Sequence, residues 1–502
     1  MFLPLLIIIP FIGGILAWQS EKINKRFPFI ISLITMFVFL IISTKILLIF
    51  LKTYNYKNEY PYWFIEYNHS WIPRFGINLH FGLDIISLIM ILLTNILSII
   101  SVIVSRHDKI KKVGFFYFNL MLIISSVIGI FISVDLFAFF LFWEIFLIPI
   151  YFMLIIWGES GLKKHNKINV ANKFFVYAQF SSFLILISII CLVCQYYNIN
   201  NVLTFDYNKL IETNFNIYLE FFITLILFFA FIIKMPIVPL HTWLKDFFYC
   251  SPKSGCIDII GLLSKTSVYG LIRFNICFFS HHYLLIYYLA IFLGMMSIIY
   301  GSLLACSQKN IKHIIAYSSV SHMGLILIAL YSNNSISYYG LILQIISSSI
   351  STSALCILSG YIFNITKSRN ILKINSLSSH VKYLPIFFMF FVLSNLNFPG
   401  TSNFISELLI LFGLFKSHYY VVIMIATTLI ITSIYSLSMF HNIFYFGSHS
   451  KIVKHHDNKI KISQYIILFV LSLISLYIGF FPQNILDISF SFIKILHNKL
   501  FF

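Results

Sequence analysis

The chain has 502 residues, 60% of them hydrophobic and only 10% charged, and its mean hydropathy is +0.93. Soluble domains carry roughly 25% charged residues, so this composition excludes a protein that mostly faces water. The formal net charge of +18 comes largely from Lys and Arg in the short connections between apolar runs. That distribution is typical of a protein embedded in the lipid bilayer, and it argues against nucleic acid as a partner.

Apolar runs of membrane-spanning length recur along the whole chain. Each is near the roughly 20 residues that a helix needs to cross a bilayer, and runs such as 221–233 lack the alternating polarity of barrel strands. We therefore expect an all-α polytopic membrane protein, in which residues 1–502 form a single membrane domain of about fourteen transmembrane helices. The predicted segments are 2–18, 28–50, 83–104, 114–133, 135–157, 171–195, 217–239, 256–278, 284–305, 310–331, 337–363, 384–415, 419–446 and 463–482.

The charges in the connections alternate along the chain. Connections after odd-numbered segments sum to about +17, and those after even-numbered segments sum to about −1. Because positive charge is retained in the cytoplasm, the odd connections are predicted to be cytoplasmic and both termini to lie outside. The outer connection 52–82 is rich in aromatic residues, and Tyr60, Tyr62, Trp63 and Trp71 are interpreted as interfacial anchors.

Five ionisable side chains are predicted to lie within the membrane, where charge is costly and usually marks an ion or proton pathway. They are Glu144, Lys234, Lys265, His322 and Glu407, in segments five, seven, eight, ten and twelve. The alternative for the four charged residues is a structural ion pair, and for the histidine it is a buried, hydrogen-bonded core residue. A nearby carboxylate favours the charged form of a lysine, so making or breaking such a pair can move a proton.

Helix breakers lie beside three of the four charged residues. Pro236 and Pro239 follow the lysine of segment seven, and Pro399 with Gly400 interrupts segment twelve. Pro149 is expected to free a backbone carbonyl near the glutamate of segment five. Broken membrane helices expose half-helix ends that hold ions or water, so these breaks favour the transport interpretation.

The spacing of two breaks suggests an internal repeat. Pro236 and Pro399 are 399 − 236 = 163 residues apart. This spacing predicts two related five-helix units, 114–278 and 284–446, arranged as inverted repeats with broken helices seven and twelve.

Hydroxyl groups and cysteines gather in several of the predicted segments. The serines and threonine of segments ten and eleven are candidates either for relaying protons or for close helix packing; they are Ser318, Ser319, Ser321, Ser347, Ser348, Ser349, Ser351, Thr352 and Ser353. Cys191 and Cys194 lie inside an apolar run and are interpreted as packing residues, so we expect no metal site. The sequence contains neither a Gly-rich dinucleotide motif nor an iron–sulfur cysteine run, and we expect no redox cofactor in this chain.

Several stretches together resemble one known family. They are FFLFWEIFLIPIYFMLIIWG (139–158), KMPIVPLHTWL (234–244), LLSKTSVYGLIRF (262–274), IKHIIAYSSVSHMG (311–324) and FPGTSNFISELLIL (398–411), together with the opening LPLLIIIPFIGG and WIPRFGINLHFGLD (71–84). These motifs resemble the antiporter-like subunits of respiratory complex I, the NADH:quinone oxidoreductase. Among these subunits they look most like the subunit M family, the equivalent of mitochondrial subunit 4.

The resemblance implies a function and the residues that perform it. It implies fourteen helices in two inverted repeats, a proton-transferring pair Glu144–Lys234, a central Lys265 and a terminal ionisable residue, Glu407. It implies that the chain is one subunit of a proton-translocating enzyme, whose NADH, FMN, iron–sulfur clusters and quinone are bound by partner subunits. Its partners would be the other membrane-arm subunits, sister antiporter-like subunits included, in a bacterial inner membrane or, as the alternative, a mitochondrial one.

Two departures from the family pattern and two other functions remain open at this stage. Relatives often carry a histidine where this chain has Ser347–Ser349, and they usually have Pro-Asp where it has Lys245-Asp246. One alternative function is that of a subunit of a multi-subunit cation/proton antiporter, against which Glu407 argues because those proteins usually have lysine there. The other is a structural spacer of the membrane arm that no longer pumps, an alternative that the serine cluster keeps open.

Overall fold

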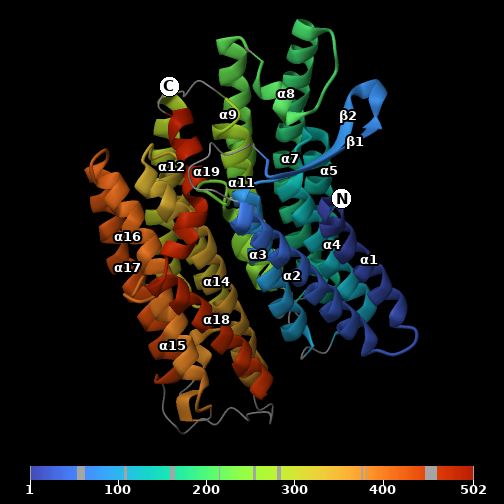
Figure 1. Cartoon of the computed structure of the whole chain (residues 1–502). Coiled ribbons are helices and arrows are strands. Elements are labelled where there is room, and N and C mark those ends of the chain that lie inside the picture. Colours follow the sequence, from blue (N-terminus) through green and yellow to red (C-terminus); the bar gives the residue numbers. More distant parts are fainter. Residues whose placement is uncertain are drawn as a thin grey trace. The chain divides into compact units, whose positions relative to one another are not determined.

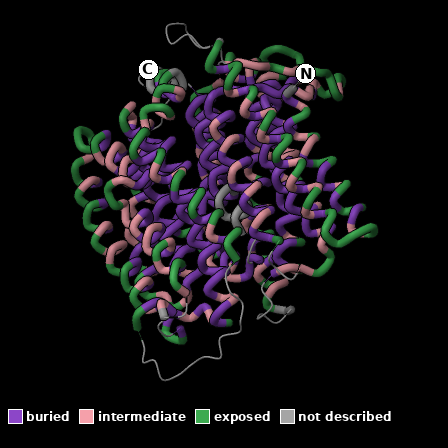
Figure 2. The backbone as a smooth tube through the Cα atoms, turned by 60° about the horizontal axis from the view of Figure 1, so that its bottom comes forward, coloured by how far each residue is buried: buried purple, intermediate pink, exposed green. Residues whose placement is uncertain are grey.

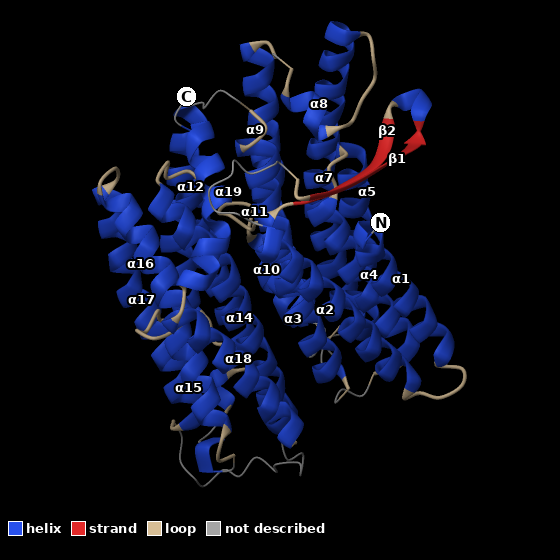
Figure 3. Cartoon of the chain, viewed as in Figure 1, coloured by secondary structure: helices blue, strands red, loops and turns tan. Residues whose placement is uncertain are grey.

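The computed structural model describes residues 2–53, 63–106, 110–158, 164–213, 215–252, 256–279, 284–374, 377–379, 381–446 and 461–500. In these residues twelve helices are long and apolar enough to cross a membrane, and two shorter apolar helices, Leu384–Asn395 and Ser402–Phe415, accompany them. Each of the fourteen predicted segments overlaps one helix, or two consecutive helical elements where the segment is interrupted. Helices are drawn in blue in Figure 3. The chain is therefore an all-α polytopic membrane protein.

Figure 1 shows the helices in chain order by colour. The longer ones are α1 (Phe2–Ser20), α2 (Phe27–Thr53), α3 (Ile85–Ser105), α4 (Val113–Ile132), α5 (Leu136–Ile145), α6 (Leu147–Trp157), α7 (Lys164–Asn200), α9 (Ile217–Lys234), α11 (Cys256–Gly270), α12 (Leu284–Ser307), α13 (Ile311–Leu330), α14 (Ser335–Thr366), α15 (Leu384–Asn395), α16 (Ser402–Phe415), α17 (Tyr419–Phe444), α18 (Ile462–Phe480) and α19 (Gln483–Leu500). The short elements are α8 (Tyr207–Ile211), α10 (Thr242–Cys250), a π-helical turn η2 (Leu271–Ile276), and the 3₁₀ turns η1 (Pro73–Phe75), η3 (Ile371–Lys373) and η4 (Leu377–Ser379).

The connection 52–82 contains a β-hairpin that the sequence analysis did not predict. Strands β1 (Ile65–Ile72) and β2 (Ile77–Leu83) pair antiparallel, with Ile65 opposite Leu83 (Figure 3, red). Gly76, at φ +67°, closes the turn in a backbone conformation that favours glycine. Trp63 is buried rather than interfacial, so its interpretation as a membrane anchor was wrong; Trp71 is exposed, and Tyr60 and Tyr62 lie outside the described residues.

The chain divides into two compact units, which we describe separately. The first comprises residues 1–235, 250–286 and 494–502. In it α1 packs against α2 and α4, α7 packs against α9, and α11 packs against α3 and α4. Figure 2 shows buried positions along the inner faces of helices and exposed positions along outer faces and in connections, as expected for helices that present apolar side chains to lipid.

The second unit comprises residues 236–249 and 287–493. Helix α14 lies at its centre, because the most apolar window of this helix is 100% buried and the helix packs against α13, α15, α16 and α18. Close approach of α14 and α16 depends on Gly340, where an added Cβ would lie 2.7 Å from the backbone oxygen of Ser406. The centre of this unit therefore brings polar side chains of α13, α14 and α16 together.

Two of the predicted helix breaks are present as breaks in the backbone. Helix α9 ends at Lys234, and the chain turns through residues 235–241 before α10 begins. Helix α15 ends at Asn395 and α16 begins at Ser402, with Gly400 at φ +92° in the turn between them. Segment five has a milder irregularity, because Phe146 separates α5 from α6 while keeping helical dihedral angles. The prolines thus end or disturb helices as expected.

Candidate proton-transfer site

Lys234 lies at the end of α9 and is enclosed by aromatic rings. The residue is 2% exposed, and its Nζ lies 3.4 Å from the ring centroid of Trp143 and 4.7 Å from that of Phe146. Among the described residues this nitrogen has no hydrogen-bond partner. A lysine ammonium over an aromatic face is held by the ring quadrupole, so α5 supplies a site that stabilises the charged form without an ion pair.

Glu144 is the next residue after Trp143 but is oriented differently. It is half-buried, and one of its carboxylate oxygens accepts a hydrogen bond of 3.0 Å from Nε2 of Gln179 on α7. Glu144 acts electrostatically on Lys234, but the two are not hydrogen-bonded, because Nζ makes no hydrogen bond. The expected pair is therefore near enough to interact electrostatically but is not in direct contact in this conformation. Glu144 instead accepts a hydrogen bond from Gln179, and the Lys234 amine lies over the rings of Trp143 and Phe146.

The third residue predicted in this unit, Lys265, lies on α11 and is 2% exposed. Eight residues further along the same helical path, Arg273 lies within the π-helical turn η2 and pairs with Asp84, the residue that caps α3. Both partners of this pair are buried. The sequence analysis missed the pair, although a charged residue inside the apolar stretch 262–274 was a signal for it.

His322 lies on α13 between two amides and is 6% exposed. Its Nε2 is 2.8 Å from Oδ1 of Asn395 on α15, and its Nδ1 is 3.3 Å from Nε2 of Gln344 on α14. Gln344 Oε1 accepts a short hydrogen bond from the hydroxyl of Ser406 on α16. The histidine is thus part of a polar network that joins four helices of the second unit.

Glu407 follows Ser406 on α16 and is 6% exposed. Its carboxylate accepts a short hydrogen bond from Nδ2 of Asn397. Asn397 lies in the break between α15 and α16 at φ +57°, a left-handed conformation in which asparagine is enriched among non-glycine residues. The broken helix therefore supplies the donor that orients the acid, and sequence reasoning identified the break but not this donor.

The hydroxyl groups of α13 and α14 are engaged with their own helices. Those of segment ten donate to carbonyls three residues back, and those of segment eleven donate to carbonyls three or four residues back. This back-bonding satisfies buried hydroxyls in a helix, and it favours the packing interpretation of most of these serines. Ser347 also contacts the hydroxyl of Ser406 at 3.3 Å.

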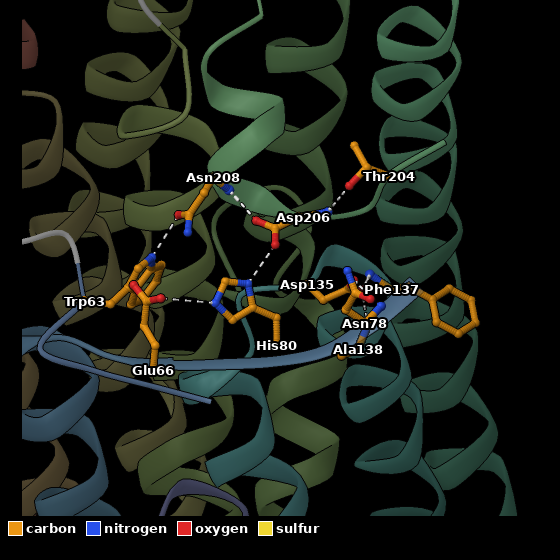
Figure 4. Close-up of polar contacts among 10 residues, drawn as sticks. All are labelled: Trp63, Glu66, Asn78, His80, Asp135, Phe137, Ala138, Thr204, Asp206 and Asn208. Carbon is orange, nitrogen blue, oxygen red and sulfur yellow. Dashed lines mark hydrogen bonds and ion pairs between the residues drawn. The ribbon is translucent and has the colours of Figure 1, made fainter. Parts of the chain in front are cut away.

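A second polar cluster lies where the hairpin meets two interhelical connections (Figure 4). Nδ1 of His80 on β2 is 2.8 Å from a carboxylate oxygen of Asp206, and its Nε2 is 3.7 Å from Glu66 on β1. The backbone N–H of Asn78 donates to Asp135 at 3.1 Å. Asp135 and Asp206 cap α5 and α8, which explains acidic residues at these positions. The connections after segments two, four and six thus meet at one end of the first unit, as the alternation of charge predicts.

Burial and contacts shift the pKa values of three groups in this cluster, His80, Asp206 and Asp135. Burial lowers the pKa of His80, but the hydrogen bond and charge of Asp206 outweigh it and raise the pKa above 6.5. Burial raises the pKa of Asp206, but the hydrogen bond and charge of His80 lower it by more, so this pKa lies below 3.8. For Asp135 burial outweighs the backbone hydrogen bonds and raises the pKa to about 6.

Comparison with known proteins decides the family. Residues 133–433 match the family described as NADH:quinone oxidoreductase/Mrp antiporter, TM. The chain is 45% identical to NADH-quinone oxidoreductase subunit M of Buchnera aphidicola subsp. Schizaphis graminum, over 99% of each chain. The chain belongs to the subunit M family of NADH:quinone oxidoreductases. The Escherichia coli K12 protein of the same name is 38% identical and aligns over 98% of this chain and 96% of its own.

Solved structures agree with the fold of the subunit M family. A chain of respiratory complex I from Thermus thermophilus superposes with a TM-score of 0.83 at 22% identity, over 99% of this chain and 100% of that one. A chain of the Mrp complex from Dietzia sp. DQ12-45-1b superposes with a TM-score of 0.81 at 18% identity, over 99% of this chain and 97% of that one. At these identities the likeness concerns the fold alone.

In this member of the subunit M family, the predicted site residues fall into two groups. Glu144, Lys234 and Lys265 belong to the first compact unit, and His322 and Glu407 belong to the second. All but Glu144 are at least nine-tenths buried. Their roles as proton carriers stay a prediction, as does the absence of a metal site from the chain.

Proposed function

We propose that this chain translocates protons as the antiporter-like subunit M of a NADH:quinone oxidoreductase, with Glu144, Lys234, Lys265, His322 and Glu407 as the proton-carrying groups. The observation that carries the proposal is the burial of lysine, histidine and glutamate side chains in membrane helices, two of them beside breaks in the backbone. Such groups are expensive in a membrane and are found where ions or protons move.

The geometry around Lys234 suggests how a proton would be moved there. Nζ of Lys234 lies over aromatic faces, and Glu144 accepts a hydrogen bond from Gln179. When the carboxylate turns toward the lysine, attraction between the opposite charges favours the protonated lysine; when it turns away, burial favours release of the proton. Glu144 would thus gate Lys234, Lys265 would pass protons along a hydrated axis with His322, and Glu407 would release or receive them.

The setting of the reaction is part of the same proposal. We place the chain in a bacterial inner membrane among other membrane-arm subunits, including sister antiporter-like subunits. NADH, FMN, iron–sulfur clusters and quinone would be bound by partner subunits, and quinone reduction there would drive the charge rearrangement here. Residues 114–278 and 284–446 would be the inverted repeats, a view supported by the breaks after Lys234 and before Ser402.

The test is NADH-driven proton uptake by inverted membrane vesicles that carry Lys234→Met or Glu144→Gln. Both variants should assemble, as judged by NADH oxidation with an artificial acceptor that bypasses quinone, and both should lose most proton uptake. Full uptake in either variant would refute the assigned roles. Rescue of a sodium-sensitive strain by this chain alone would favour the cation/proton antiporter instead.

A further inference from the structure

The two amides around His322 fix where its hydrogen lies. The amide nitrogen of Gln344 can only donate, so Nδ1 of the histidine is the acceptor in the 3.3 Å contact. A neutral imidazole then carries its hydrogen on Nε2, which donates to Oδ1 of Asn395 across 2.8 Å. The ring is therefore held in one neutral tautomer, and the amide of Gln344 opposes a second proton on Nδ1.

The far end of Gln344 has a second arrangement available to it. In the structure its Oε1 accepts from the hydroxyl of Ser406. The same hydroxyl oxygen lies 2.8 Å from the backbone carbonyl oxygen of Asn403, which is an alternative acceptor for its hydrogen. The hydroxyl can thus either donate to the amide oxygen, or donate to the carbonyl and accept from the amide nitrogen.

We propose that Gln344 is a positioning residue that admits the second proton of His322 by a half-turn of its side-chain amide. When Nδ1 gains a proton, Oε1 turns to accept from it, and Nε2 turns to donate to Ser406. The hydrogen of Ser406 moves to the carbonyl of Asn403, so the ring hydrogens of His322 and the hydroxyl hydrogen of Ser406 have acceptors in both states. The hydrogen bond to Asn395 is kept, because both nitrogens of an imidazolium donate. This inference rests on the proposed function, in which His322 carries protons.

Every member of this network belongs to the second unit, and most are fully buried. Gln344, Ser406 and Asn403 are all 0% exposed. Titratable groups near the network include Tyr435 on α17, which is hydrogen-bonded to Asn395, and Glu407, which acts electrostatically on Tyr435. If Gln344 served only for packing, loss of its hydrogen-bond partner Ser406 would leave the pH response unchanged, and this difference separates the two roles.

The experiment compares the pH dependence of NADH-driven proton uptake in inverted vesicles, from about pH 5.5 to 8.5. In Gln344→Glu the carboxylate accepts from the imidazolium and holds it, so the alkaline limb should move upward by about one pH unit or more. In Ser406→Ala the turned amide loses its acceptor, so the alkaline limb should move downward. Ser359→Ala is the matched control, since this buried hydroxyl of α14 donates only to its own helix, to the carbonyl of Cys356; it should leave the profile unchanged.

His322→Gln separates failure of this inference from failure of the proposed function. If His322→Gln takes up protons as the wild type does, His322 is not a carrier and the proposed function is wrong at this residue. If His322→Gln loses uptake while Gln344→Glu and Ser406→Ala keep the wild-type profile, the amide half-turn is overturned and the proposed function stands. Assembly of each variant is measured with the artificial electron acceptor. If the carboxylate of Gln344→Glu prevents assembly, the pH profile of Ser406→Ala alone decides between the two outcomes.

Discussion

Replacing Trp143 with leucine should make the charged form of Lys234 scarcer. The indole ring lies 3.4 Å from Nζ and is 0% exposed, and a desolvated cation–π contact contributes about 2 kcal/mol. Because a tenfold change in an equilibrium corresponds to about 1.4 kcal/mol, removal of the ring lowers the ratio of charged to neutral lysine about 30-fold. The ring of Phe146, at 4.7 Å, is too distant to replace the contact in full.

The assay is NADH-driven proton uptake in inverted vesicles as a function of pH, normalised to NADH oxidation with an artificial acceptor. Trp143→Leu should lose uptake at pH values where the wild type is fully active and regain part of it at lower pH. Trp143→Phe keeps an aromatic face, so its pH profile of proton uptake should lie between those of the wild type and Trp143→Leu. Trp143→Leu with normal assembly and a wild-type pH profile would refute the argument that the rings hold the ammonium.

The remaining predictions concern two charged clusters of the first unit. The raised pKa of His80 gives the hairpin stability that is complete below pH 6.5 and is lost as the pH rises through the higher folded value, whereas the lowered pKa of Asp206 gives stability that is lost only in acid. Amide exchange in β2, corrected for its intrinsic pH dependence, should therefore accelerate as the pH rises through the raised pKa of His80, and His80→Gln should abolish that step. Asp135, whose pKa is raised from 3.8 to about 6, should cost the hairpin stability as the pH rises through that range, so β2 exchange, corrected in the same way, should also accelerate between about pH 4 and 6. Asp84→Asn should destabilise the chain by about 3–5 kcal/mol because it leaves Arg273 charged, buried and unpaired, seen as a lower melting temperature, and Asp84→Asn with Arg273→Gln should recover part of the loss.

Helix positions and the membrane-buried charges could be predicted because each depends on local sequence. An apolar run of sufficient length specifies a spanning helix, and prolines specify where it breaks, as after Lys234. The hairpin was missed because burial alternates only in part along β1 and hardly at all along β2. The buried position of Trp63 depends on a distant partner, Asn208, 145 residues away.

The contacts that define the candidate site were beyond reach of the sequence for a similar reason. Gln344 and Asn395 meet His322 from helices 22 and 73 residues away along the chain. Which face of one helix meets which face of another depends on packing, and a single sequence does not specify it. Gln179, which takes the hydrogen-bonding role beside Glu144, carries no charge and was not distinguishable from other polar residues in an apolar run.

The most direct test of proton transfer through this chain is the number of protons moved per electron by the purified complex in liposomes. Lys265→Met removes a buried amine from a membrane helix, where such groups usually mark a path for ions or protons. Proton transfer through this subunit predicts fewer protons per electron in Lys265→Met than in the wild type. An unchanged ratio in a fully assembled Lys265→Met complex would show that the protons travel elsewhere and that this chain is a spacer.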